Sequence, residues 1–286
     1  MIDAKIGIIG GSGVYEIEGA KFIKEIKIRT PFGEPSDAVK IIEIDGTRVA
    51  FLPRHGIGHR YSPAEVNYRA NIYVLKKIGI EKILAVSACG SLKEEIKPRD
   101  FVIPDQIYDR TKSRPSTFFD RGVVVHIGFA HPYCQELSKV LYETTKSLNF
   151  PVHNGGTYVC IDGPQFSSKA ESKVYRSLGF SIIGMTGIPE AKLAREAEMC
   201  YASIGLATDY DVWKEGEEVT VDKVIENMHI LTTNVKKVIK SVITKIDHCT
   251  KCTCKDALKY AIMTSPKAIS MTTKKRLELL IGKYVK

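Results

Sequence analysis

The sequence predicts an α/β protein with a central mixed β-sheet flanked by helices. Short apolar runs typical of buried strands alternate with longer segments of helical periodicity. Glycines or other small residues follow several of these runs, as in the loops at the carboxyl ends of strands. The 286 residues, 44% of them hydrophobic, are enough for one large domain. We expect residues 1–247 to form its core and residues 248–286 a Cys-rich helical tail.

The predicted strands are short runs that are apolar or rich in β-branched residues. In chain order they are Ile6 to Ile9, Lys21 to Lys27, Val39 to Ile44, Thr47 to Leu52, Lys82 to Ala88, Thr157 to Ile161, Phe180 to Met185 and Ile204 to Thr208. Asp45-Gly46 predicts a hairpin turn between the third and fourth runs, because this dipeptide adopts the positive φ angles of tight hairpins.

The predicted helices begin at residues with a known preference for helix starts. Ser62 suits the N-cap and Pro63 the first helical position. Ser168 with Glu171 forms a capping box for another helix. The remaining starts are Pro132, Pro189 for a helix through about Tyr201, and Thr220 for a long helix to about Ile246. One or two shorter helices are expected in the tail.

The charge and composition exclude several partners. The net charge is +9, but Lys and Arg are spread along the chain and no basic stretch is interleaved with aromatic residues. We interpret the charge as a solvated basic surface and expect no nucleic-acid partner. No run approaches the roughly 20 apolar residues that cross a bilayer, so no membrane partner is expected. The N-terminus has no signal pattern, which favours a cytoplasmic location.

Three loops that follow predicted strands have the composition of anion sites. In Gly10 to Gly13, backbone N–H groups and a hydroxyl can surround phosphate, although a plain tight turn uses the same residues. Pro53 to Arg60 places Arg and His side chains at a strand end, where Arg can bind phosphate in bidentate fashion; the alternative is a basic surface loop. Ser87 to Ser91 leaves room for a ligand, and we interpret its Cys89 as an inert buried thiol.

Two segments rich in potential ligands allow more than one interpretation. Thr208 to Trp213 contains two carboxylates separated by one residue, which suits a general acid and its supporter, a cation site, or an acidic loop that caps a helix. His248 to Cys254 contains one His and three Cys. Its spacing lacks the two separated ligand pairs of most zinc folds. Disulfides are favoured over bound metal or free thiols, and all three remain open.

Taken together, these segments resemble the 5'-methylthioadenosine phosphorylase family within the trimeric purine nucleoside phosphorylase superfamily. The matching segments are Ile6 to Gly13, Thr30 to Asp37, Arg54 to His59, Val66 to Asn71, Ala88 to Leu92, Asp105 to Arg114, Asp162 to Ser168, Met185 to Glu190, Cys200 to Ser203 and Thr208 to Glu215. The resemblance implies the nucleoside phosphorylase fold, with its mixed, partly closed sheet. It also implies phosphorolysis of methylthioadenosine to adenine and 5-methylthioribose 1-phosphate, adenosine as a further candidate substrate, and a homotrimer or hexamer.

The resemblance also implies roles for individual residues. Phosphate would be bound by Ser12, Arg54, His55, Ser87, the backbone of Ala88, and Thr186. The nucleoside would be bound by Phe166, Ser167, Met185, His59, His126, Val221, Val224 and Ile225, with His126 supplied by a neighbouring subunit. Asp209 and Asp211 would be the catalytic residues that face the adenine.

The chemistry implied by this resemblance centres on Asp209. Cleavage of the C1'–N9 bond builds positive charge on the ribose and negative charge on the purine. A neutral Asp209 would donate to N7 and accept from the 6-amino group. That requires a raised pKa, which burial and the neighbouring Asp211 carboxylate would favour. Asp at this position favours a 6-aminopurine, whereas Asn would suit a 6-oxopurine. No metal or cofactor is expected, and inorganic phosphate is a co-substrate.

The tail and two other positions distinguish this chain within the family. Its Cys-rich tail resembles that of hyperthermophile members, in which the tail forms disulfides; the candidate cysteines are Cys134, Cys200, Cys249, Cys252 and Cys254, with the pairing open. Gly187 replaces a hydroxyl residue of some members, and Gln165 a common Arg. The alternative functions are a 6-oxopurine nucleoside or methylthioinosine phosphorylase, a nucleic-acid-binding protein, and a metal-binding module in the tail.

Overall fold

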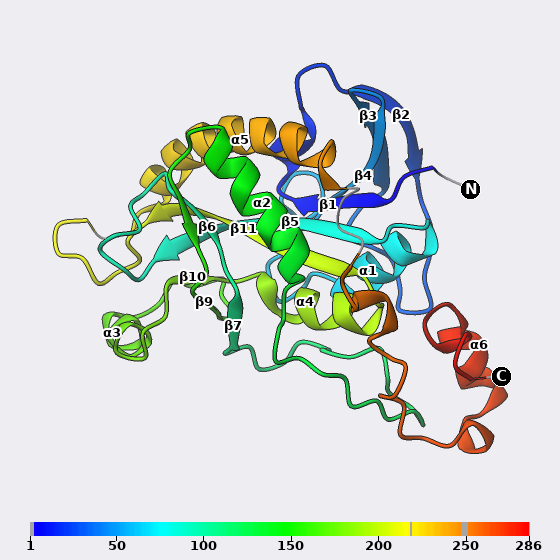
Figure 1. The fold of residues 1–286 in the computed structure, drawn as a ribbon. Helices are drawn as coiled ribbons and strands as arrows, with labels where there is room; N and C mark the ends of the chain where they lie inside the picture. Colours follow the sequence, from blue (N-terminus) through cyan, green and yellow to red (C-terminus); the bar gives the residue numbers. More distant parts are fainter. Residues whose placement is uncertain (1–2, 218, 247–250, 286) are drawn as a thin grey trace.

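A branched mixed sheet forms the centre of the molecule, and helices cover both of its faces (Figure 1). The structure is a computed structural model that describes residues 3–217, 219–246 and 251–285. The predicted α/β class with a mixed sheet flanked by helices is confirmed. Across these described ranges, no helix combines the length and the apolar character needed to cross a membrane.

The sheet contains strands from the whole length of the core. They are β1 (Ile6–Gly10), β2 (Lys21–Ile26), β3 (Val39–Ile44), β4 (Thr47–Pro53), β5 (Lys82–Ser91), β6 (Phe101–Ile103), β7 (Gln106–Asp109), β8 (Val152–Asn154), β9 (Thr157–Cys160), β10 (Ile182–Gly184) and β11 (Cys200–Asp209). The α-helices are α1 (Tyr68–Lys77), α2 (Gln135–Ser147), α3 (Lys169–Ser177), α4 (Gly187–Glu196), α5 (Val221–Ile243) and α6 (Met271–Ile281). Short 3-10 helices include η1 (Ser12–Tyr15), η3 (Cys254–Asp256) and η4 (Pro266–Ala268).

Strand β5 is the branching point of the sheet. It pairs in parallel with β1 on one side and with β11 on the other, and its last residues, Gly90 and Ser91, pair antiparallel with β10. Strand β4 is parallel to β1. Therefore β1, β4, β5 and β11 all point the same way, and their carboxyl ends meet at one edge, where ligands bind in open α/β sheets.

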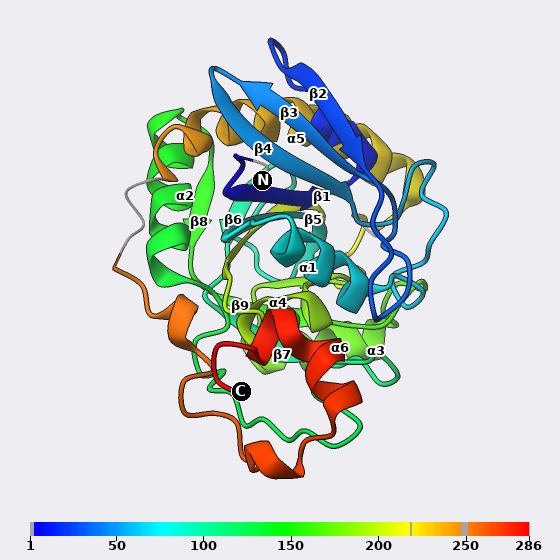
Figure 2. The same cartoon turned by 90° about the vertical axis from the view of Figure 1, so that its right-hand side faces the viewer.

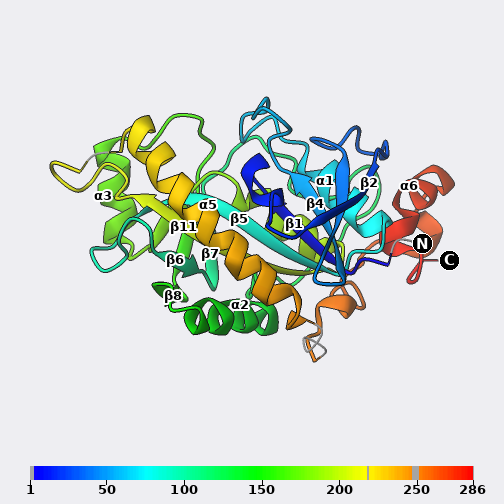
Figure 3. The same cartoon turned by 90° about the horizontal axis from the view of Figure 1, so that it is seen from above.

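The alternation of side chains along the strands builds a core on each face of the sheet. Ile8 and Leu84 belong to the core that includes apolar residues of α2 and α5, whereas their neighbours Ile9 and Ala85 belong to the core that includes residues of α1, α4 and α6. Figure 3 shows α5 lying across β5 and β11. Figure 2 shows α6 beside α4 and α1 on the opposite face. The C-terminal segment thus packs onto the core through apolar contacts.

Most predicted elements are present, and several local signals are confirmed. The capping box of Ser168 and Glu171 begins α3, and the Thr220 hydroxyl accepts from the Lys223 N–H at the start of α5. Asp45 and Gly46 have φ angles of 47° and 80°, as the hairpin between β3 and β4 requires. These signals are local in sequence, which is why they could be recognised without the fold.

Some predicted boundaries were wrong. Helix α1 begins at Tyr68 rather than at Ser62-Pro63, because the Asn67 side chain accepts from the Ala70 N–H and caps the helix there. Helix α2 begins at Gln135 rather than at Pro132. Helix α4 ends at Glu196 rather than near Tyr201, since the chain enters β11 at Cys200. Strands β6, β7 and β8 were missed, because runs of three or four residues carry too little periodicity.

Candidate active site

A cavity of about 690 Å³ opens at the edge where the parallel strands end. The loops after β1 and β4, the second half of β5, the end of β11, and the segments after β9 and β10 line it, and the first half of α5 covers one side. Its volume lies in the range of small-molecule sites. Most of the predicted site residues line it, namely Arg54, His55, His59, Ser87, Ala88, Phe166, Ser167, Met185, Thr186, Asp209, Asp211, Val224 and Ile225.

Arg54 lies at the bottom of the cavity and is only 2% exposed. Its Nε and Nη2 atoms donate to the two carboxylate oxygens of Glu190 at 2.8 and 2.9 Å. The Arg54 Nη1 atom also donates to the Val86 carbonyl at 2.9 Å, and Nη2 donates to the Ile9 carbonyl at 3.5 Å. The bidentate partner of Arg54 is therefore Glu190, so phosphate can use only what remains of the guanidinium fork. Tyr201 donates to Glu190 at 2.8 Å and completes this buried network.

Hydroxyl groups lie next to Arg54 at the same end of the cavity. The Ser87 and Thr186 hydroxyls are 3.0 Å apart and both residues are buried, yet both line the cavity. Gly11 and Gly13 line it from the loop after β1, where η1 begins. Ser12 lies between them, but its side chain is outside the described part of the structure, so its role stays a prediction. This end of the cavity has the hydroxyl and N–H donors that bind oxyanions.

Two stacked histidines lie on the rim beside Arg54. The rings of His55 and His59 are 4.2 Å apart and inclined by 9°. The Nδ1 atom of His55 is 2.8 Å from the Tyr61 carbonyl, so Nδ1 carries the hydrogen and Nε2 is free to accept. Burial and the Arg54 charge lower the pKa of His55 to about 4. His55 is therefore neutral near pH 7 and can bind the protonated oxygen of a phosphate rather than act as a second cation.

Asp209 and Asp211 lie at the other end of the cavity, at the end of β11. Asp209 is 7% exposed, accepts from the Thr208 hydroxyl at 2.6 Å and from the Asp211 N–H at 2.7 Å, and burial raises its pKa. Burial, with an added contribution from the Asp209 carboxylate, raises the pKa of Asp211 to about 6. The predicted rise in the pKa of Asp209 is present and is due to burial. A raised pKa favours the neutral form of a carboxyl group, and that form can donate a proton.

Strand β5 sets the distance between the two ends. Ser87 belongs to the hydroxyl cluster, whereas Gly90 pairs with Asp209 in the sheet. Three residues of extended chain separate them by about 10 Å. A Cβ atom on Gly90 would lie 2.9 Å from Asp209 Oδ1, so the strand approaches the carboxyl this closely only because residue 90 is glycine. The space between the two ends can hold a sugar.

The remaining predicted nucleoside residues divide into two groups. Phe166, Ser167 and Met185 line the cavity between its two ends, and Val224 and Ile225 line it from α5. Val221 is 61% exposed and is not among the lining residues that the structure describes. His126 is exposed, and its backbone N–H donates to the Ala261 carbonyl near the tail, away from the cavity of its own chain. Its predicted contribution to a neighbouring subunit stays a prediction.

Several residues that shape the site were not predicted. Glu190, fully buried, was noted only as part of a matching segment, although an acidic residue within an apolar helical stretch is the signal of a buried ion pair. The Arg114 Nη1 atom donates to the Met185 and Ile188 carbonyls at 2.6 Å and holds in place the backbone that leads from β10 into α4. Gly187 is the first residue of α4, and a Cβ atom there would meet Ile107 at 2.7 Å and Tyr158 at 2.9 Å. Packing therefore explains why no hydroxyl residue stands at position 187.

The fold and this cavity define an α/β protein with a small-molecule site that has hydroxyl and guanidinium donors at one end and two buried carboxyl groups at the other. Residues 5–244 match the family model of the phosphorylase superfamily. The S-methyl-5'-thioadenosine phosphorylase of Geobacter sulfurreducens is 54% identical over 282 residues, which cover 98% of this chain and 99% of the relative. That of Pyrococcus furiosus is 51% identical over 255 residues, covering 89% and 98%.

Solved structures agree with these sequence relatives. A methylthioadenosine phosphorylase from an antarctic soil metagenomic library superposes with a TM-score of 0.93 at 47% identity, covering 97% of this chain and 98% of the other. The enzyme of Schistosoma mansoni in complex with adenine has a TM-score of 0.84 at 36% identity, covering 90% and 96%. The chain belongs to the phosphorylase superfamily and, within it, to the S-methyl-5'-thioadenosine phosphorylase family.

Proposed function

We propose that this chain cleaves 5'-deoxy-5'-methylthioadenosine with inorganic phosphate, releasing adenine and 5-methylthioribose 1-phosphate. Relatives of this name match nearly the whole chain at about half identity. Within the site, the observation that carries the proposal is a buried carboxyl of raised pKa, Asp209, opposite a hydroxyl-lined anion pocket. Adenosine is a further candidate substrate. The reaction needs no metal or cofactor in this proposal.

In the proposed mechanism, phosphate binds through the Ser87 and Thr186 hydroxyls, the Ala88 N–H, neutral His55 and the free part of the Arg54 guanidinium. As the C1'–N9 bond breaks, positive charge develops on the ribose and the bound phosphate dianion stabilises it. A phosphate oxygen then bonds to C1', while the electron pair of the broken bond leaves with the purine. Asp209 donates its proton to N7, which neutralises the leaving adenine.

The specificity for a 6-aminopurine follows from the same carboxyl group. After protonating N7, the second oxygen of Asp209 can accept a hydrogen bond from the 6-amino group. A 6-oxopurine presents an acceptor at this position and leaves that oxygen unpaired, which a buried site penalises strongly. The 6-oxopurine alternative is therefore less favoured. In the proposed arrangement Met185 contacts the ribose, Phe166 and Ser167 the purine, and Val224 and Ile225 the methylthio group.

We also propose self-association to a homotrimer or hexamer. Val221 and Ile225 are more than half exposed at the start of α5, and His126 lies exposed outside the cavity of its own chain. A neighbouring subunit would cover the apolar residues and bring its His126 to the methylthio end. Light scattering after gel filtration measures the subunit number, and a monomer would contradict this part of the proposal. The cytoplasmic location and the division at residue 247 remain predictions.

One assay tests the activity itself. Adenine release from methylthioadenosine is followed spectrophotometrically with and without inorganic phosphate, and inosine and methylthioinosine are compared under the same conditions. The proposal predicts phosphate-dependent adenine release and slower turnover of both oxopurines. Release that does not depend on phosphate would indicate a hydrolase, and faster oxopurine turnover would reverse the substrate assignment.

A further inference from the structure

Four cysteines from three separate parts of the sequence converge outside the catalytic cavity. The Sγ atoms of Cys134, Cys200, Cys252 and Cys254 all lie within 4.8 Å of one another, and the Cys200 and Cys252 sulfurs are 3.2 Å apart. Three of the residues are buried and Cys252 is half-buried. All four are free thiols, so the predicted disulfides are not formed among these residues. Cys249, the remaining candidate, lies outside the described residues.

Two of the four sulfurs are held by the rigid core of the protein. Cys134 is the N-cap of α2, and Cys200 is the first residue of β11. The Cys134 N–H donates to the carbonyl of Tyr201 at 2.8 Å, which joins the two elements at this point. Both positions are therefore set by the secondary structure of the core and do not depend on a contact with the tail.

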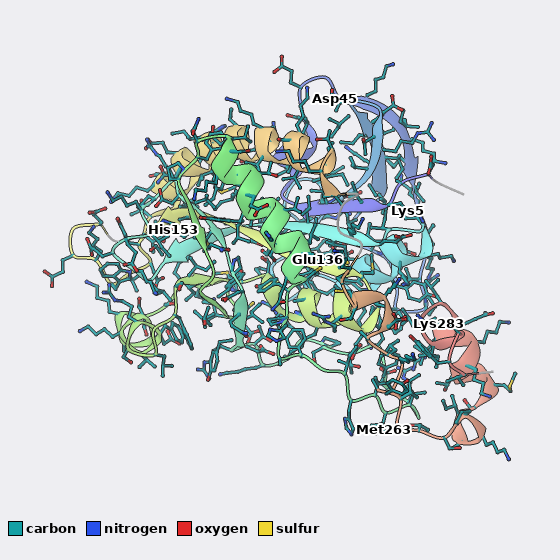
Figure 4. All side chains as sticks on the ribbon, viewed as in Figure 1. Lys5, Asp45, Glu136, His153, Met263 and Lys283 are labelled. Carbon is teal, nitrogen blue, oxygen red and sulfur yellow. The ribbon has the colours of Figure 1, made fainter. Side chains whose placement is uncertain are left out.

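The tail supplies the other two sulfurs. The Lys251 N–H donates to the carboxylate of Glu136 at 3.1 Å, which ties the tail to the first turn of α2. Figure 4 labels Glu136 at this end of α2, close to the tail. Cys252 follows directly, and Cys254 begins η3 and is buried. The C-x-C spacing thus turns two side chains of the tail toward the two core cysteines.

We propose that these four cysteines bind one structural zinc ion as a tetrahedral tetrathiolate site. Zinc–sulfur bonds of about 2.3 Å place the sulfurs of such a site about 3.8 Å apart. The observed sulfur–sulfur distances, which include one of 3.2 Å and none above 4.8 Å, lie on both sides of this value. Two disulfides would instead divide the sulfurs into two bonded pairs. This proposal departs from the expectation that no metal is bound, because the core adds Cys134 and Cys200 to the two cysteines of the tail.

The surroundings of the cluster suit the charge of such a site. Binding of Zn²⁺ to four thiols releases four protons and leaves a net charge of −2 on the site. The Arg195 Nη1 atom lies 3.6 Å from Cys254 Sγ and can donate to that sulfur. Cys134 lies at the N-terminus of α2, where the helix dipole stabilises negative charge. With four protein ligands, no coordination position stays open for substrate, which is typical of structural zinc sites.

The zinc site would attach the tail to the core independently of the proposed activity. None of the four cysteines is among the described residues that line the catalytic cavity. Residues 252–254 precede the apolar residues Leu258, Leu277 and Leu280, which pack in the core with α1 and α4. A metal link at 252–254 therefore holds the start of the C-terminal segment where its apolar residues can dock.

Metal content and thiol state of the purified full-length protein test the proposal. The protein is produced with added zinc, purified without chelators and analysed for metals, and its intact mass is measured under denaturing, non-reducing conditions. We expect about one zinc per chain and the mass of a fully reduced chain. A mass lower by two or four hydrogens without zinc would indicate disulfides and overturn the proposal. Iron with acid-labile sulfide, or free thiols without metal, would also overturn it.

Variants locate the metal. Cys254→Ser is expected to lower the zinc content at least about tenfold, since one of the four ligands is lost. The matched control is Cys160→Ser, the same change at a buried cysteine outside the cluster, which should retain zinc. If Cys254→Ser does not fold, cobalt substitution of the wild-type protein replaces it. Tetrahedral sulfur-coordinated Co²⁺ gives intense visible absorption, and its absence would contradict the site.

Discussion

The change Asp209→Asn tests the proposed proton donor with the least disturbance of the fold. The Asp211 N–H donates to Oδ1 of Asp209 at 2.7 Å, so the amide oxygen of the variant must occupy this position. The amide nitrogen then takes the place of Oδ2, next to the Thr208 hydroxyl at 2.6 Å. That hydroxyl can accept from the amide and donate to the Cys89 carbonyl, which already lies 3.2 Å away. The variant should therefore fold.

The expected effect is a large loss of turnover with methylthioadenosine. The amide of Asn can donate a hydrogen bond to N7 but has no proton to transfer, so the leaving adenine departs without neutralisation. Removal of one such stabiliser costs about 10²- to 10³-fold, which corresponds to about 2.7–4 kcal/mol. Turnover of methylthioinosine should fall less, because an amide can donate to the 6-oxygen of that substrate. The ratio of kcat/KM for the two nucleosides should therefore shift toward the oxopurine.

The assay compares kcat/KM for methylthioadenosine and methylthioinosine in wild type, Asp209→Asn and a matched control. Asp45→Asn is suitable, because Asp45 (labelled in Figure 4) lies in the β3–β4 hairpin turn, is not among the described residues that line the cavity, and has a φ of 47° that Asn tolerates well. The control should behave like wild type with both substrates. If Asp209→Asn keeps its activity toward methylthioadenosine within about threefold, Asp209 does not supply the proton and the reasoning is refuted.

Three further predictions follow from burial at the site. Burial and the Asp209 carboxylate raise the pKa of Asp211 from 3.8 to about 6. The ionised Asp211 therefore lowers the free energy of unfolding above pH 6, by up to about 3 kcal/mol. This loss of stability becomes smaller as the pH falls from 6 toward 3.8. Urea unfolding should therefore show that Asp211→Asn is more stable than wild type at about pH 8, and that this gain in stability is roughly halved at about pH 5. An equal gain in stability at both pH values would contradict the raised pKa of Asp211. The pKa of His55 is lowered from an ordinary 6.5 to about 4, which predicts an NMR titration midpoint near 4 without phosphate and a higher midpoint with phosphate. The stability of the protein should decline as the pH falls from 6.5 to 4. A midpoint near 6.5 would contradict the proposal that neutral His55 binds phosphate. Gly187→Ala should destabilise the protein by about 1–3 kcal/mol through overpacking. The control Gly128→Ala, whose new Cβ would have no atom within 4 Å, should leave the stability unchanged. Equal melting temperatures of the two variants would refute the packing explanation.

The burial that shapes this site also has a stability cost. The buried Arg54–Glu190 pair lies at one end of the cavity and the two buried carboxyls of Asp209 and Asp211 lie at the other. Such groups are usually more costly to bury than apolar residues of similar volume. The two apolar cores on the faces of the sheet offset that cost through the apolar surface that they bury.

The sequence alone determined most of the elements and the loops that line the cavity. Asp45-Gly46, Ser168 with Glu171, and Thr220 act on neighbouring backbone, so their turn and caps could be predicted within a few residues. The glycine and hydroxyl loops at strand ends were recognised in the same way. The start of helix α1 was predicted wrongly, because Ser62-Pro63 has the composition of a helix start but Asn67 caps the helix.

Only the tertiary structure decided which of these groups meet. Arg54 and Glu190 are separated by 136 positions in the chain, and their ion pair determines how much of the guanidinium remains for the proposed phosphate. The cysteines of the tail looked like a poor metal site until the core brought Cys134 and Cys200 beside them. Local patterns record the preferences of adjacent backbone, whereas burial, pKa shifts and ligand sets arise when sheet pairing and apolar packing bring distant segments into contact.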